Sequence, residues 1–134
     1  MNLIYIAALK SKNNTTVCIK LYRTGDKPAL VFFYDFGVNS CNLAKLLALH
    51  LFLYDTNLDT DSPTTAFMDS DSLVFEYENY LNKDDPNYNK TKHMKPWERL
   101  CGDIQKFTSF TVSNTGMLTI SARDTLKQHF ANAT

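Results

Sequence analysis

Three strand-like segments follow one another in the first 36 residues, and they constrain the fold more than any other feature of the sequence. Residues 3–9, 15–23 and 29–36 are rich in β-branched and aromatic side chains, which is the composition of β-strands. Asn13-Asn14 separates the first two segments, and Thr-Gly-Asp-Lys-Pro at 24–28 separates the last two. Because short turns join antiparallel neighbours, we predict an antiparallel three-stranded meander.

The middle of the chain gives a helix signal, a polar stretch and a strand signal. Residues 43–54 form a leucine-rich run that predicts a helix, and Asn39 or Ser40 can cap its first turn. Residues 55–72 are polar and predict a loop. Residues 73–80 then alternate between apolar and polar side chains, which is typical of a half-buried strand. On such a strand, Glu76 and Glu78 would share the outer face.

The last third predicts two helices around a hairpin. Pro96 suits the first turn of a helix that runs to about residue 107. The sequence Ser-Asn-Thr-Gly predicts a hairpin between residues 109–112 and 117–121. Residues 124–130 form a short closing helix.

These elements predict a single α+β domain over residues 1–134, in the order βββαβαββα. We expect an antiparallel sheet with the helices packed mainly on one face. A chain of 134 residues with 44% hydrophobic residues can bury a core unaided. No apolar stretch approaches the ~20 residues of a membrane span. The three cysteines form no CxxC pattern, and we expect a cytoplasmic protein with reduced thiols and no membrane contact.

The chain is neutral overall, but its charge is sharply segregated. Residues 1–54 and 86–134 each carry a net charge of +4, whereas residues 55–85 carry nine Asp or Glu against one Lys, a net −8. Such a stretch repels itself unless solvent, a cation or a basic surface meets it. We therefore predict a surface for a basic protein partner, with tyrosines as aromatic anchors. Its candidate residues are Asp55, Asp59, Asp61, Asp69, Asp71, Glu76, Glu78, Tyr77, Tyr80 and Tyr88.

The leading hypothesis is a small non-enzymatic protein-binding module. The acidic segment 55–85 would occlude a Lys/Arg-rich surface that normally holds nucleic acid, because an acidic face imitates a phosphate backbone. Small proteins of this composition without a catalytic signature are often inhibitors of the immunity or anti-defence type. We therefore expect an accessory protein of a phage or mobile element, with no catalytic residues.

Two other hypotheses stay open. Residues 88–99 interleave aromatic side chains with cations, as segments that bind single-stranded nucleic acid do. The candidate residues of this nucleic-acid-binding alternative are Lys90, Lys92, Lys95, Trp97 and Arg99. The other alternative is a small enzyme whose site is assembled from residues that lie far apart in sequence.

No metal or cofactor motif is complete. One loop places oxygen ligands at alternate positions, as the start of an EF-hand calcium loop does. The four residues of this weak calcium candidate are Asp55, Asn57, Asp59 and Asp61. The loop lacks the glycine at its sixth position and the glutamate at its twelfth, where Thr60 and Ala66 stand. We therefore expect no metal and no cofactor.

Overall fold

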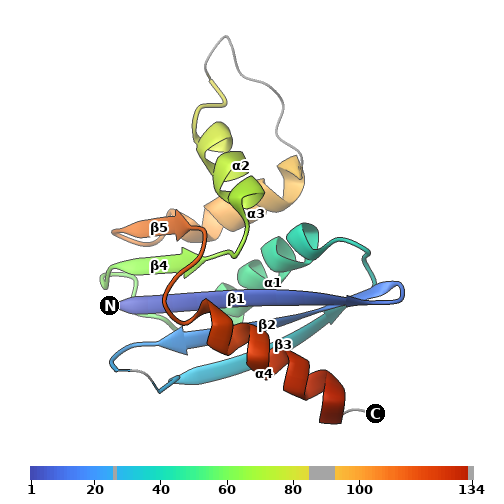
Figure 1. Cartoon of the computed structure of the whole chain (residues 1–134). Helices are drawn as coiled ribbons and strands as arrows, with labels where there is room; N and C mark the ends of the chain where they lie inside the picture. The colour runs from blue at the N-terminus through green and yellow to red at the C-terminus, as the bar shows by residue number, and fades with distance from the viewer. Residues whose placement is uncertain (26, 85–92, 133–134) are drawn as a thin grey trace.

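The structure is a computed structural model that describes residues 1–25, 27–84 and 93–132. Within these residues, five strands form one sheet in the order β3-β2-β1-β4-β5, and four helices pack around it (Figure 1). The elements in chain order are β1 (Asn2–Ser11), β2 (Asn14–Tyr22), β3 (Leu30–Phe36), α1 (Cys41–Asp55), β4 (Thr64–Phe67), α2 (Asp71–Leu81), α3 (Met94–Ile104), β5 (Phe110–Ser113) and α4 (Thr119–Asn132).

The predicted α+β fold is confirmed, and the sheet is mixed. β1, β2 and β3 form the predicted antiparallel meander. β4 then pairs with β1 in parallel, and β5 pairs with β4 in parallel. The central strand β1 therefore has an antiparallel neighbour on one side and a parallel neighbour on the other.

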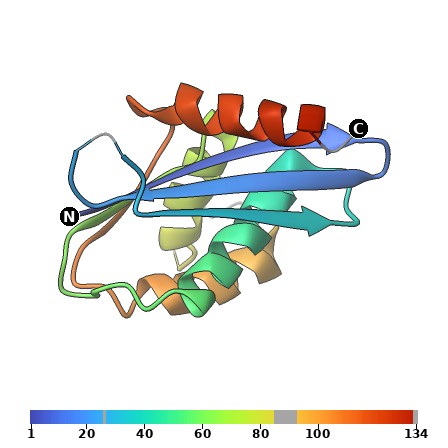
Figure 2. The same cartoon turned by 90° about the horizontal axis from the view of Figure 1, so that it is seen from below.

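Helices cover both faces of the sheet. Since successive side chains of a strand point to opposite faces, the central strand contributes to a core on each side. Ile4 and Ile6 of β1 belong to the larger core, which contains the buried side chains of α1, α2 and α3. Tyr5 and Ala7 point the other way and form a second core with α4. Figure 2 shows α4 alone above the sheet and α1 below it. Of the helices in the described part of the chain, none is long and apolar enough to cross a membrane.

Three local predictions are wrong. Residues 73–80 belong to helix α2, not to a strand, because Ser70 caps a helix by accepting a hydrogen bond from the Leu73 amide at 3.2 Å. The expected loop at 55–72 contains β4, whose four residues pair with β1 and with β5. The expected second strand at 117–121 is instead the approach to α4 and its first turn.

The start of α4 lies close to the sheet because of Gly116. A Cβ atom on this residue would stand 2.6 Å from the Phe67 ring and 2.7 Å from the Tyr5 ring. These two rings stack with their centroids 4.6 Å apart. The lack of a side chain at Gly116 therefore lets the chain cross tightly over the rings before α4 begins.

Candidate functional site

The order in which the chain builds the sheet reverses at β1. From β1, the chain adds β2 and β3 on one side and later adds β4 and β5 on the other. Since β1, β4 and β5 are parallel, their carboxyl ends lie at the same edge of the sheet. In open sheets with such a reversal, ligands bind beyond the carboxyl ends of the strands at the switch point. The boundary between β1 and β4 is therefore the first place to look for a site.

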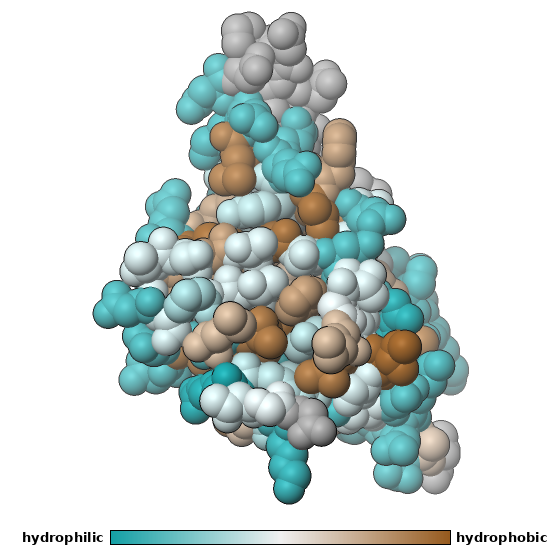
Figure 3. Space-filling model, turned by 60° about the vertical axis from the view of Figure 1, so that its left-hand side comes forward, coloured by the Kyte–Doolittle hydropathy of each residue, from teal (hydrophilic) through white to brown (hydrophobic). Residues whose placement is uncertain are grey.

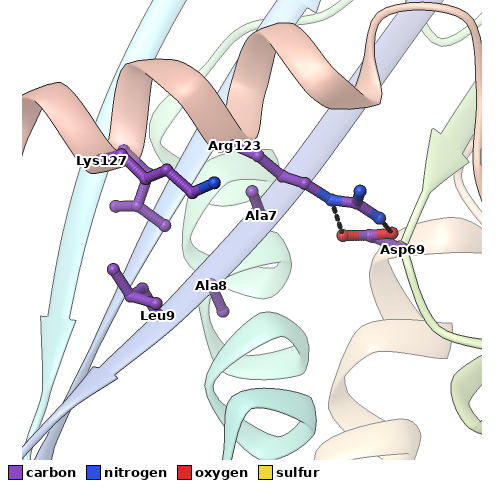
Figure 4. Close-up of a pocket in the computed structure, with 7 residues that line it drawn as sticks. Ala7, Ala8, Leu9, Asp69, Arg123 and Lys127 are labelled. Atoms are coloured by element: carbon purple, nitrogen blue, oxygen red, sulfur yellow. Dashed lines mark hydrogen bonds and ion pairs between the residues drawn. The ribbon is translucent and has the colours of Figure 1, made fainter.

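A pocket lies at this boundary (Figure 4). The last residue pair between β1 and β4 joins Tyr5 to Phe67, and β1 continues beyond it to Ser11. The pocket has a volume of about 130 Å³, which gives room for a phosphate group or a few water molecules. It is lined by Ala7, Ala8, Leu9, Asp69, Arg123, Leu126 and Lys127.

Asp69 and Arg123 form the polar wall of the pocket. Asp69 follows the end of β4 with a left-handed backbone (φ 53°), and its amide donates to the Asn114 carbonyl at 2.9 Å. Arg123 donates from Nε to Asp69 Oδ2 at 2.8 Å and from Nη2 to Asp69 Oδ1. This bidentate pair holds the guanidinium in one orientation and raises the pKa of Arg123. The Arg123 side chain is still 45% exposed, so its outer edge faces solvent.

Lys45 approaches Asp69 from the opposite face of the sheet. Helix α1 begins after Ser40, whose hydroxyl accepts from the Leu43 amide, and this start places Lys45 in the early part of the helix. The ammonium donates to the Asp69 carbonyl oxygen at 3.1 Å, and the residue is only 5% exposed. Burial lowers the pKa of Lys45, and the nearby Asp69 charge opposes this effect. Lys45 and Arg123 thus both contact Asp69, and Lys127 lines the same pocket as Asp69 and Arg123.

The donor groups at this pocket do not suit a divalent metal ion. Mg²⁺ is bound by carboxylate and other oxygen ligands, and catalytic metal sites need several of them to converge. Asp69 supplies the single carboxylate of the pocket lining, and Arg123 already binds both of its oxygens. Across residues 1–25, 27–84 and 93–132, no group of three or more His, Cys, Asp and Glu is placed to hold a metal ion. The positive groups favour an anion instead.

The acidic residues of α2 do not share one exposed surface. Glu76 is buried and accepts hydrogen bonds from His93 Nδ1 at 2.9 Å and from Trp97 Nε1 at 3.1 Å, whereas Glu78 is exposed. Since the two residues lie on a helix and not on a strand, they point in different directions. Asp71 is exposed, and its carboxylate accepts a hydrogen bond from the Asn114 side chain.

The loop of the weak calcium candidate is held by contacts within the protein. Asp59 accepts from the Asp61 amide at 3.0 Å and from the Ser62 hydroxyl at 2.9 Å, and these bonds lower the pKa of Asp59. Asp55 accepts from the Tyr34 hydroxyl at 3.3 Å, and Asp61 accepts from the Thr108 hydroxyl at 3.3 Å. Asn57 is exposed. The four oxygen-bearing side chains therefore do not form a metal cluster in the structure.

The predicted aromatic and basic residues are dispersed. Tyr80 is buried, and Tyr77 packs half-buried against Trp97 with the ring centroids 5.5 Å apart. Trp97 is itself completely buried, so its ring is not available to stack on a base. Lys95 and Arg99 are exposed on α3. Tyr88, Lys90 and Lys92 lie outside the described residues.

Sequence reasoning missed most of the pocket. Asp69 was expected on an acidic docking surface, and no role was predicted for Lys45, Arg123 or Lys127. One usable signal was Lys45 itself, the sole charged residue in the leucine-rich run at 43–54. A second was the spacing of Arg123 and Lys127, which puts two cations on the same face of a helix.

No protein-family model matches the sequence, and no curated protein matches it. Solved structures do match over nearly the full length. The N-terminal RNase H domain of a Mycobacterium tuberculosis protein, solved as a fusion with maltose-binding protein, has a TM-score of 0.70 at 14% identity, covering 93% of this chain and 94% of that one. RNase H1 from the halophilic archaeon Halobacterium salinarum has a TM-score of 0.67 at 17% identity, covering 93% and 92%. LC11-RNase H1 in complex with an RNA/DNA hybrid has a TM-score of 0.67 at 12% identity, covering 92% of each chain.

The predicted inhibitor of a basic protein surface is wrong. These three structural neighbours are RNase H proteins, one of the three bound to a nucleic acid, and they support the nucleic-acid-binding alternative better than a protein inhibitor. The structure also separates the acidic residues on which the inhibitor hypothesis depended, because Glu76 is buried against Trp97 and Asp69 is paired with Arg123. This chain therefore has the RNase H-like fold, shared with these neighbours at 12–17% sequence identity.

Proposed function

We propose that this protein binds nucleic acid at the pocket between β1, β4 and α4, and that an RNA/DNA hybrid is the first ligand to test. The observation that carries the proposal is the position of Lys45, Arg123 and Lys127 around the carboxyl end of β4. The fold supports it, because a structure with the same architecture is solved with an RNA/DNA hybrid.

The chemistry of the pocket fits a phosphate backbone. Arg123 and Lys127 are four residues apart on α4 and so project from one face of the helix. The Asp69 pair uses two of the five N–H groups of the guanidinium, and its outer edge faces solvent. Arginine and lysine contacts to phosphates supply affinity that depends on salt and little on sequence. We therefore expect binding to a class of nucleic acid and not to one sequence.

The test is fluorescence anisotropy with a labelled RNA/DNA hybrid, compared with DNA, RNA and single-stranded ligands between about 50 and 200 mM salt. The double variant Arg123→Gln/Lys127→Gln should bind the hybrid at least about tenfold more weakly, since each charged hydrogen bond contributes about 1.5–3 kcal/mol. The slope of the logarithm of the binding constant against the logarithm of the salt concentration should decrease in magnitude by about one for each lost phosphate contact.

The matched control removes two cations at the other end of the sheet. Arg23 and Lys27 are exposed in the turn between β2 and β3, away from the pocket. The double variant Arg23→Gln/Lys27→Gln should bind like the wild-type protein. Equal losses in the two double variants would mean that affinity follows net charge alone, and the pocket would not be the binding site.

A third double variant tests the basic segment that the sequence singled out. Lys95 and Arg99 are exposed on α3, on the larger-core side of the sheet. If Lys95→Gln/Arg99→Gln weakens hybrid binding while the Arg123 and Lys127 variant does not, the interface lies on α3 and the pocket proposal fails.

A further inference from the structure

We infer that the pocket binds a backbone phosphate directly, through Arg123 and Lys127 and without a divalent metal ion, next to the buried ammonium of Lys45 at Asp69. This inference rests on the proposed function, because it specifies how the same site holds nucleic acid. It also departs from metal-dependent phosphate chemistry, for which the pocket lacks the ligands.

The first argument is the identity of the side chains at the switch point. A metal ion that acts on a phosphate needs converging carboxylate oxygens and an open coordination position. The central strand contributes Ala7 and Ala8 here, and a methyl group cannot be a ligand. The oxygens of Asp69 are both bound by Arg123. A divalent cation would therefore meet apolar groups, an occupied carboxylate and like charges.

The second argument is that Lys45 is a buried lysine and not a surface lysine. It is 5% exposed, and its hydrogen bond goes to the backbone carbonyl of Asp69 and not to the carboxylate. The Asp69 carboxylate is thus left to Arg123, and it is the single negative charge in a pocket lining that contains two cations, Arg123 and Lys127. The excess of positive charge suits a bound anion.

The third argument is the geometry of the opening. Figure 4 shows Arg123 and Lys127 extending from α4 on one side of the pocket, with Ala7, Ala8 and Leu9 of β1 opposite them. Asp69 fixes the inner edge of the guanidinium, so the outer N–H groups and the Lys127 ammonium can donate to the same phosphate. The small side chain of Ala7, on the α4 face of β1, leaves the space in which that phosphate would lie.

The experiment measures the dissociation constant for an RNA/DNA hybrid in EDTA and in Mg²⁺, together with cleavage of the hybrid in Mg²⁺ and Mn²⁺. The wild-type protein should bind equally well in both buffers, to within about a factor of two, and should show no metal-dependent cleavage. Binding that requires Mg²⁺, or cleavage that requires either metal, would overturn this inference and leave the proposed function standing.

A second readout separates the inference from the proposed function. Inorganic phosphate is titrated into ¹⁵N-labelled protein, and the resonances of Arg123 Nε–H and of the Ala7 and Ala8 amides are followed. We expect saturable shifts that are lost in Arg123→Gln/Lys127→Gln and retained in Arg23→Gln/Lys27→Gln. Phosphate shifts without hybrid binding would support the phosphate site and reject nucleic acid as its ligand. Absence of both would reject the two proposals together.

Discussion

Arg123 on α4 binds both carboxylate oxygens of Asp69, while Lys45 on α1 donates to the backbone carbonyl of the same residue. The two helices cover opposite faces of the sheet (Figure 2). Asp69 lies just beyond the end of β4, where side chains of both helices contact it. One residue therefore links both layers of the fold to the switch point. This arrangement makes the pocket positively charged and fixes the orientation of its guanidinium.

Replacing Lys45 by Met should separate binding from stability. Burial of the ammonium is costly, and an apolar side chain of similar volume removes that cost, so the variant should unfold at the same temperature or a higher one. Its affinity for the hybrid should fall about three- to tenfold, because the site loses one of three cations. The exposed Lys106→Met is the control, and it should change neither property. A Lys45→Met protein that binds as well as wild type would contradict the role of Lys45.

The same variant tests the pKa of Lys45. Because burial lowers this pKa in the folded protein, the unfolded chain binds the proton more strongly at alkaline pH. The free energy of unfolding of the wild type should therefore rise relative to Lys45→Met as the pH increases from the folded pKa towards the unfolded value of 10.5. Urea titrations at several pH values measure the difference. A difference that is constant with pH would show that Lys45 is not desolvated.

Glu76 and Glu78 should respond very differently to substitution by alanine. Glu76→Ala removes the acceptor of the buried Trp97 N–H and should cost about 1–3 kcal/mol of unfolding free energy. Glu78→Ala changes an exposed side chain and should stay within about 0.5 kcal/mol of the wild type. Urea unfolding measures both changes, and the dependence of the unfolding free energy on urea concentration should stay the same in the two variants. Equal effects would mean that residues 73–80 form the half-buried strand and not helix α2.

Two Gly→Ala substitutions should change the stability of the protein in opposite directions. Gly116→Ala places a methyl group against the stacked rings of Phe67 and Tyr5, and overpacking of this kind costs about 1–3 kcal/mol. Gly102→Ala meets no atom within 4 Å and lies in α3, where alanine is favoured over glycine by about 0.5–1 kcal/mol. Thermal unfolding should show a lower midpoint for the first variant and a higher one for the second. Equal midpoints would contradict the tight crossing before α4.

The three cysteines should react with iodoacetamide in a fixed order. Burial raises the pKa of Cys18 and of Cys101 to about 11, so both are almost fully protonated near neutral pH. Cys41 is only partly buried at the start of α1 and should be alkylated first. Mass spectrometry of the native protein at pH 8 measures the order, and denaturation should make all three sites reactive. Early alkylation of Cys18 would contradict its place in the core under α4.

Local signals explain the part of the fold that could be predicted. The meander was predictable because each of its strands carries β-favouring residues and its turns are short. The Ser40 cap likewise marked the start of α1. By contrast, β4 is four residues long and becomes a strand through β1 and β5, which lie far from it in sequence. For α2, the alternation of residues 73–80 hid the helical spacing of its buried side chains, Leu73, Glu76 and Tyr80.

The site could not be predicted because its residues meet only through the topology. Asp69 lies 24 residues from Lys45 and 54 residues from Arg123. Net charge along the sequence assigned Asp69 to an acidic surface, whereas the fold surrounds it with cations. On the face that Figure 3 presents, the exposed apolar side chains lie in small groups among polar side chains.

The most direct measurement is the dissociation constant for an RNA/DNA hybrid in EDTA, for the wild type and for Arg123→Gln/Lys127→Gln. The structure predicts metal-independent binding by the wild type that weakens at least about tenfold in the double variant. Equal binding by the two proteins, or binding by the wild type that disappears in EDTA, would contradict a phosphate site formed by these cations.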